Sequence, residues 1–242
     1  KTCANAAMGG HLDCLKYAHN NGCPWDRQTC THAAKGGHLD CLKYAHINGC
    51  PWDRQTCAHA ARYGHLECLK YLHENKCPWY KETCLSAAKN GHLECLKYAY
   101  KNGCHWDIKI FVNAAKDGRN LECLKYLHEK GCPWNERVLV NNAAKRGRLK
   151  CLNYAYKNGC PWNEETFFNI AKDGGYLECL KYLHEKGCPW NEETCLSAEK
   201  NRHLECLEYL KHLHEIACKS LDWCEGRCDI CWKKYLECTK KH

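Results

Sequence analysis

Cysteine and histidine are the residues of this chain whose types and spacing could do chemistry. The 242 residues include 25 Cys and 16 His. A His three positions before a Cys could hold a metal ion with it on one helix face, or act as the base beside a nucleophilic thiol. The spacing occurs at His11/Cys14, His38/Cys41, His65/Cys68 and His92/Cys95. Because each pair is one copy in a repeated column, whereas a catalytic residue is normally singular, we interpret these pairs as structural.

No catalytic sequence signature accompanies these residues. The motifs HExxH, GxSxG, GxxxxGK[ST] and GxGxxG do not occur in the sequence. We therefore predict a protein that is not an enzyme and that needs no cofactor in its repeated part.

The segment 218–242 has a cysteine pattern of its own. Cys228 and Cys231 form a CxxC, and Cys224 and Cys238 could complete a zinc site with them. A zinc ribbon needs a second CxxC, which this segment lacks. The same cysteines have the spacing of the apolar stripe of a helix. The sequence favours a helix that caps the C-terminal end of the fold, with a zinc site or disulfides as alternatives.

Most other cysteines fill columns that recur along the chain. One column holds Cys3, Cys30, Cys57, Cys84 and Cys195, and has Phe111, Val140 and Phe167 at its other sites. Replacement by Val and Phe indicates a buried apolar position, which a free thiol can occupy as a small hydrophobe. The cysteine total is odd, 25, and no N-x-S/T site occurs. We therefore expect free thiols in a reducing, intracellular compartment.

These columns arise because the sequence contains an internal repeat. The stretch GHLDCLKYAHNNGCPWDRQTC from Gly10 returns along the chain, and its Trp recurs at Trp25, Trp52, Trp79, Trp106, Trp134, Trp162 and Trp190. A fixed period of this size indicates stacked supersecondary units. The sequence of each unit predicts two short antiparallel helices. The first begins after an N-cap such as Asp26 or Asp53 and ends at a Gly such as Gly37. On the second, Asp40 with Lys43 and Glu67 with Lys70 have the spacing of ion pairs.

The units resemble the ankyrin repeat family. Residues 60–77, AARYGHLECLKYLHENKC, are similar to its paired alanines, GHLE turn and Leu-rich second helix. The resemblance implies an all-α, ankyrin-like helical-repeat solenoid of about eight helix pairs over residues 1–217, followed by a cap at 218–242. Because these units are 27 or 28 residues long, against roughly 33 in ankyrin, we expect shortened fingers. The GCPW units look most like ankyrin repeats of giant DNA viruses and amoebae, which would place the protein in host cytoplasm or a virion.

The charge of the chain limits its partners. The net charge is +8 at pH 7, and a basic column recurs near the end of the first helices. No stretch approaches the roughly 18 apolar residues that span a membrane. An acidic protein surface is the favoured partner. Nucleic acid stays an alternative, as does a structural role in a larger, possibly viral, assembly.

Repeated residues hold a stack together, so the positions that vary are free to specify a partner. In the ankyrin family the first helices line a concave face that grips partner proteins. We therefore predict a protein–protein interaction scaffold, of unassigned oligomeric state, that binds its partner on that face. The predicted contact residues are Thr31, His32, Lys35, His59, Arg62, Tyr63, Ser86, Lys89, Asn113, Lys116, Asn142, Lys145, Arg146, Asn169, Lys172, Ser197 and Lys200.

Overall fold

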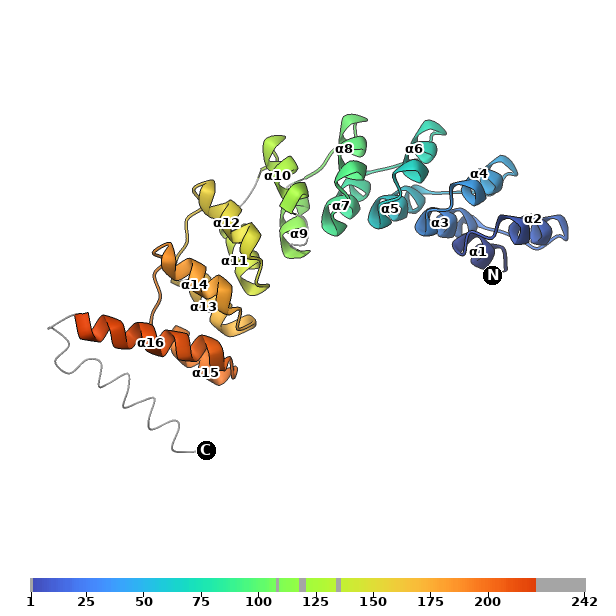
Figure 1. Ribbon diagram of the computed structural model, residues 1–242. Coiled ribbons are helices and arrows are strands. Elements are labelled where there is room, and N and C mark those ends of the chain that lie inside the picture. The colour runs from blue at the N-terminus through green and yellow to red at the C-terminus, as the bar shows by residue number, and fades with distance from the viewer. Residues whose placement is uncertain (1, 108, 118–120, 134–135, 221–242) are drawn as a thin grey trace. The chain divides into compact units, whose positions relative to one another are not determined.

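The computed structural model describes residues 2–107, 109–117, 121–133 and 136–220, and these form sixteen helices and no strand (Figure 1). The predicted all-α fold of eight helix pairs is therefore confirmed. The chain divides into unit 1, residues 1–134, and unit 2, residues 135–242. Each unit is a stack of helix pairs and is described by itself.

In unit 1 the first helices of the pairs are α1 (Thr2–Met8), α3 (Arg27–Gly36), α5 (Arg54–Tyr63), α7 (Lys81–Asn90) and α9 (Lys109–Asp117). Its second helices are α2 (Leu12–Asn20), α4 (Leu39–Ile47), α6 (Leu66–Glu74), α8 (Leu93–Lys101) and α10 (Leu121–Glu129).

In unit 2 the first helices are α11 (Glu136–Lys145), α13 (Glu164–Asp173) and α15 (Glu192–Lys200). Its second helices are α12 (Leu149–Lys157), α14 (Leu177–Glu185) and α16 (Leu204–Ser220). The last helix continues past residue 217, where we divide the repeat array from the cap. That boundary stays a prediction, because residues 221–242, with Cys224, Cys228, Cys231 and Cys238, lie outside the described part of the chain.

The first helices begin and end as the sequence predicts. Asp53 has an extended backbone, its carboxylate accepts a hydrogen bond from the Gln55 amide at 2.9 Å, and Thr56 completes a capping box. Asp26 accepts from the Gln28 amide at 2.8 Å in the same way. These carboxylates satisfy amides that the first turn leaves without a helical partner. The helices end where Gly37 and Gly64 adopt left-handed conformations, with φ of +77° and +79°.

The second helices end on an Asn–Gly turn in four of the eight pairs. In α4 the side-chain amide of Asn48 donates to the Tyr44 carbonyl at 2.8 Å, and Gly49 follows with φ of +81°. The side-chain bond satisfies a carbonyl that the last turn of the helix leaves without a helical partner.

One of the two expected ion pairs forms on the second helices. Lys70 pairs with Glu67 on α6 at 2.8 Å. The corresponding prediction for α4 is wrong. Asp40 has a shorter side chain than Glu67, and its carboxylate makes no ion pair with a described residue. The Lys43 ammonium instead lies 5.8 Å from the centre of the Tyr71 ring.

Small and apolar side chains of both helices form the core. Cys30, Ala33, Ala34 and Leu42 are fully buried, as are their equivalents in the neighbouring repeats. The paired alanines let the first helices of unit 1 pack closely in one row, while the second helices contact one another much less (Figure 1). Unit 1 therefore curves with its first helices on the inner side.

Two recurring contacts join one repeat of unit 1 to the next. The His65 ring lies against Gly37 of the preceding repeat, and its Nε2 donates to the Lys35 carbonyl at 3.1 Å. On the second helices, the His46 ring stacks on Trp52 with centroids 3.7 Å apart and hydrogen-bonds the Tyr71 hydroxyl at 2.8 Å. The stacking and the hydroxyl contact recur in the repeats before and after, so the Trp, His and Tyr columns are structural.

Candidate functional site

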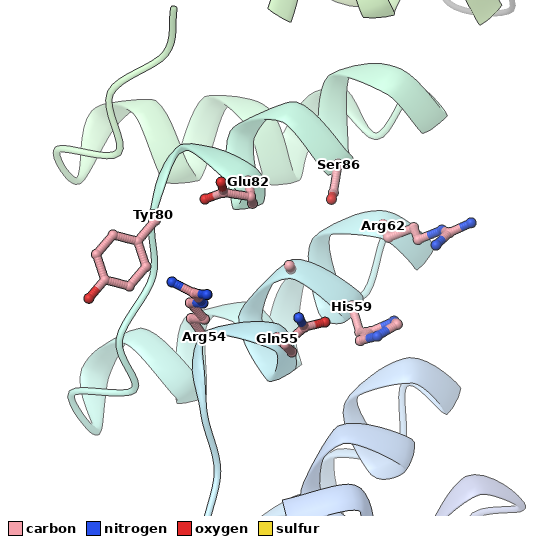
Figure 2. Close-up of a pocket in the computed structure, with 8 residues that line it drawn as sticks. Arg54, Gln55, His59, Arg62, Tyr80, Glu82 and Ser86 are labelled. Carbon is pink, nitrogen blue, oxygen red and sulfur yellow. The ribbon is translucent and has the colours of Figure 1, made fainter.

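Two adjoining hollows lie on the first-helix side of unit 1. One, of about 250 Å³, is lined by Arg54, Gln55, Ala58, His59, Arg62, Tyr80, Glu82 and Ser86. The other shares four of these residues and extends over α3, where Arg27, Gln28 and Thr31 line it; Asp53, the N-cap of α5, lines it too. We call the two together the Arg54–Tyr80 groove. Figure 2 shows Glu82 and Ser86 on α7 across from Gln55 and His59 on α5.

Cations outnumber anions in the Arg54–Tyr80 groove. The guanidinium group of Arg54 lies 5.7 Å from the centre of the Tyr80 ring, and that of Arg62 lies 5.8 Å from the centre of the Tyr63 ring. Neither arginine makes an ion pair with any residue in the described part of the chain, whereas Arg27 pairs with Asp53 at 3.6 Å. Because both unpaired guanidinium groups keep their hydrogen-bond donors, the groove can receive carboxylates.

His59 stands at the centre of the groove with one ring nitrogen unsatisfied. Its Nδ1 is buried and makes no hydrogen bond to any described residue. Burial, and then the positive charges of Arg62 and Lys35, lower the pKa of His59. The neutral form of the ring is therefore favoured at pH 7.

The residue at position 80 breaks the pattern of the repeat. The equivalent positions hold Asp26, Asp53 or Asp107 in unit 1 and Asn in unit 2, and these residues suit the N-cap. Tyr80 has the N-cap backbone conformation, with φ of −140° and ψ of −175°, but its side chain caps no amide and is 54% exposed. Loss of an Asp cap costs about 1 kcal/mol. A local rule broken in this way is a mark of a functional position.

The next position breaks a second rule. It holds Arg27, Arg54 and Lys81 in unit 1, but Glu in the three repeats of unit 2. The N-terminal end of a helix carries a partial positive charge, so a cation in the first turn is disfavoured there. Sequence reasoning missed Arg27, Arg54 and Tyr80, although comparison of the N-cap columns between repeats could have found them.

Most of the predicted contact residues are accessible. Those with exposed or half-buried side chains are Thr31, His32, Lys35, His59, Arg62, Tyr63, Ser86, Lys89, Asn113, Asn142, Lys145, Arg146, Lys172 and Lys200. Asn169 and Ser197 are buried, 5% and 8% exposed, so neither offers an exposed side chain to a partner. The side chain of Lys116 lies outside the described residues.

Only some of these residues meet in one place. The groove brings together Thr31, His59, Arg62 and Ser86. Asn113 and Asn142 instead use their side-chain amides on carbonyls of their own helices, each at 2.8 Å. Both hydrogen bonds run back along the helix by one turn, so these side chains are held away from a partner.

Over the described ranges, no three His, Cys, Asp or Glu side chains gather in a way that could hold a metal ion. None of the described helices has the length and apolar character needed to span a bilayer.

Comparisons with known proteins agree with this architecture. The family model for ankyrin repeats (3 copies) matches residues 3–79 and 31–110. None of the curated proteins matches the chain. Among solved structures, the crystal structure of the human ASB11 ankyrin repeat domain is similar, with a TM-score of 0.60 and 20% sequence identity over 78% of this chain and 99% of that one. The likeness of the GCPW units to giant-virus repeats stays a prediction. The protein therefore has the ankyrin repeat fold, and its residues 3–110 match the ankyrin repeat family model.

Proposed function

We propose that this protein is a non-enzymatic binding module, whose Arg54–Tyr80 groove takes an acidic segment of a partner protein. The observation that carries the proposal is the pair of broken helix rules at positions 80 and 54. An exposed tyrosine replaces an N-cap, and an unpaired arginine stands where the helix dipole disfavours it. Both choices cost stability and both supply groups to one groove.

The chemistry of the groove favours carboxylates. A carboxylate between Arg54 and Arg62 would accept charge-assisted hydrogen bonds from two guanidinium groups that form no ion pair with a described residue. Tyr80 and Tyr63 offer flat apolar surface beside these arginines, and aromatic residues and Arg are the residues enriched where partners bind. The proposed location is an intracellular, reducing compartment, where the thiols of the repeats stay free.

The test uses a random peptide library displayed on phage and selected on the intact chain. We expect the selected peptides to be rich in Asp and Glu, and synthetic copies to bind less well as salt rises. The R54E/R62E variant should lose affinity by roughly tenfold to a hundredfold per contact, since a hydrogen bond to a charged group contributes about 1.5–3 kcal/mol.

The matched control is K150E/K157E, which makes the same two reversals of charge on exposed Lys150 and Lys157 of α12 in unit 2. It should leave peptide affinity unchanged, and circular dichroism should show both variants folded. Selected peptides without acidic residues, or affinity that survives R54E/R62E, would refute the proposal. Tighter binding of a single-stranded DNA oligonucleotide, lost in R54E/R62E, would refute it too and assign the groove to phosphates.

A further inference from the structure

Thiols occur in pairs in the first four repeats of unit 1. The inner cysteine of each pair lies on the first helix of its repeat, and the outer cysteine follows the second helix of the same repeat. The pairs are Cys3/Cys23, Cys30/Cys50, Cys57/Cys77 and Cys84/Cys104. In each pair the inner Sγ donates to the backbone carbonyl of the outer cysteine, at 3.6, 3.7, 3.9 and 3.3 Å in chain order, so the two cysteines are neighbours.

The two members of a pair have different surroundings. The inner thiol of Cys84 is fully buried in α7, and its Sγ donates to the Cys104 carbonyl at 3.3 Å. The outer thiol of Cys104 is 3% exposed and donates to the Tyr80 carbonyl at 3.2 Å. Cys50 donates to the Asp26 carbonyl, also at 3.2 Å. The outer thiol of every pair therefore lies at the edge of its repeat, nearer to solvent than the inner one.

The contact within a pair also separates the acidities of its members. The neighbouring inner side chain lowers the pKa of Cys50 and of Cys104. The neighbouring outer side chain, and then burial, raise the pKa of Cys30 and of Cys84. The outer sulfur of these pairs is thus the one that ionises first, and the thiolate is the reactive form of cysteine.

The first pair follows the same order. The neighbouring inner side chain lowers the pKa of Cys23, while burial raises that of Cys3 to about 11. In the third pair, the neighbouring Cys57 side chain and burial raise the pKa of the outer Cys77.

Packing alone does not require the second thiol. In the next three repeats the inner cysteine is replaced by Phe111, Val140 or Phe167, while the outer column keeps Cys132, Cys160 and Cys188. Phe111, Val140 and Phe167 are as buried as the inner cysteines. The chain therefore carries four repeats with a thiol pair and three without, on the same backbone.

We propose that the four thiol pairs are sites of oxidative modification, each forming one disulfide within its own repeat when the chain meets hydrogen peroxide. The thiolate of a pair attacks one peroxide oxygen, the O–O bond breaks, and hydroxide leaves, which takes up the proton that the thiol released. The second thiol then attacks the sulfur of the sulfenic acid and the S–S bond forms. The hydroxyl group leaves with the proton of the second thiol as a second water. Two thiols are oxidised by two electrons, and one peroxide is reduced to two waters.

None of the paired cysteines lines the Arg54–Tyr80 groove. Each disulfide would tie a first helix to the turn that closes the same repeat, so it would add no link between repeats. It would constrain the unfolded chain of unit 1 and leave the three repeats without pairs unchanged. We expect oxidation to raise the melting temperature of unit 1 and to preserve peptide binding in the groove.

The experiment treats the intact chain with hydrogen peroxide, stops the reaction with catalase, and alkylates the remaining thiols in denaturant with N-ethylmaleimide at acidic pH. Mass spectrometry of the digest should show the disulfides of all four pairs. Cys132, Cys160 and Cys188 should be recovered alkylated from the same samples.

Two variants test the pairing in opposite directions. C57V should abolish the disulfide of its own repeat, leave Cys77 alkylated, and keep its fold, because Val140 already occupies this column. V140C should create a new disulfide between position 140 and Cys160. The proposal is overturned if the eight paired thiols are recovered alkylated while exposed Cys14 is oxidised, or if they are oxidised singly to sulfinic acids. Disulfides between different repeats would overturn it as well, and this result can be read from the unsubstituted chain alone.

Discussion

Replacing Tyr80 by Asp should stabilise the protein while it weakens binding in the groove. Tyr80 has φ of −140° and ψ of −175°, and the capping residue Asp53 has −142° and −178°. An aspartate at position 80 therefore fits without backbone movement, and its carboxylate would accept from the amide of Glu82, as Asp53 accepts from Gln55.

The size of the gain follows from the contacts that change. A new Asp cap contributes about 1 kcal/mol. The lost contact between Arg54 and the Tyr80 ring contributed roughly 0.5–1 kcal/mol, since it is exposed. The new carboxylate would form an exposed ion pair with Arg54, equivalent to the Arg27–Asp53 pair, of about 0.2–1 kcal/mol. These last two contributions offset one another, so the net gain is about 1 kcal/mol.

The assay is urea unfolding of the intact chain, with Y80A and D53A as controls. Y80A removes the ring without adding a cap and should not be stabilised, whereas D53A should lose about 1 kcal/mol. A gain of about 1 kcal/mol in Y80D corresponds to a rise in melting temperature of about 2–4 °C for a chain of this size. If Y80D is no more stable than Y80A while D53A is destabilised, the assignment of position 80 as a vacated cap is wrong. Acidic peptides should bind Y80D less tightly than the unsubstituted chain, because the new carboxylate repels them.

Three further substitutions test the helix ends and the ring contacts. G64A should destabilise the protein by more than G49A. Both glycines have φ near +80°, but only a Cβ at position 64 would meet the His92 ring. Equal losses of stability in urea unfolding would contradict this packing. K76G should stabilise by about 1 kcal/mol, since Lys76 has φ of +62° where the other repeats carry Gly; an unchanged unfolding midpoint would refute it. Burial lowers the pKa of His46 below its ordinary value of 6.5. As the pH drops through this range, the unfolded state therefore binds more protons than the folded state, and the stability of the fold falls. H46Y, a residue that other repeats carry at this position, should flatten this pH dependence, and an unchanged slope between pH 7 and pH 5 would count against it.

The fold could be predicted from the sequence because each repeat carries the residues that begin and end its helices. Asp53 predicts where α5 begins and Gly64 where it ends, and both are local rules that a single turn of helix enforces. The columns that tolerate Cys, Val and Phe were predicted to be buried, and Cys30, Val140 and Phe167 are buried. The periodicity of the sequence identifies helix ends and buried positions well, because the equivalent residue of every repeat has the same environment.

The candidate site was less predictable, for a physical reason. Variation between repeats identified His59 and Arg62 but could not separate an exposed position from a buried one, and Asn169 is 5% exposed. Whether a hollow forms depends on side chains of three successive first helices, such as Arg54 and Tyr80, which lie far apart in the chain. The thiol pairs were missed for the same reason, since most of a repeat separates two neighbouring sulfur atoms along the sequence.

The contacts that join one repeat of unit 1 to the next also bear on how such a chain can change its length. The His–Gly and His–Trp–Tyr contacts return in successive repeats with the same partners, so each junction accepts the same counterpart. A deletion of residues 54–80 would join Asp53 to Lys81, place an aspartate before α7, and let His92 take the place of His65 against Gly37. Unequal recombination between repeats could therefore add or remove whole repeats at little cost to the remaining junctions. A gene built this way can vary the number of its repeats faster than it varies the residues within them.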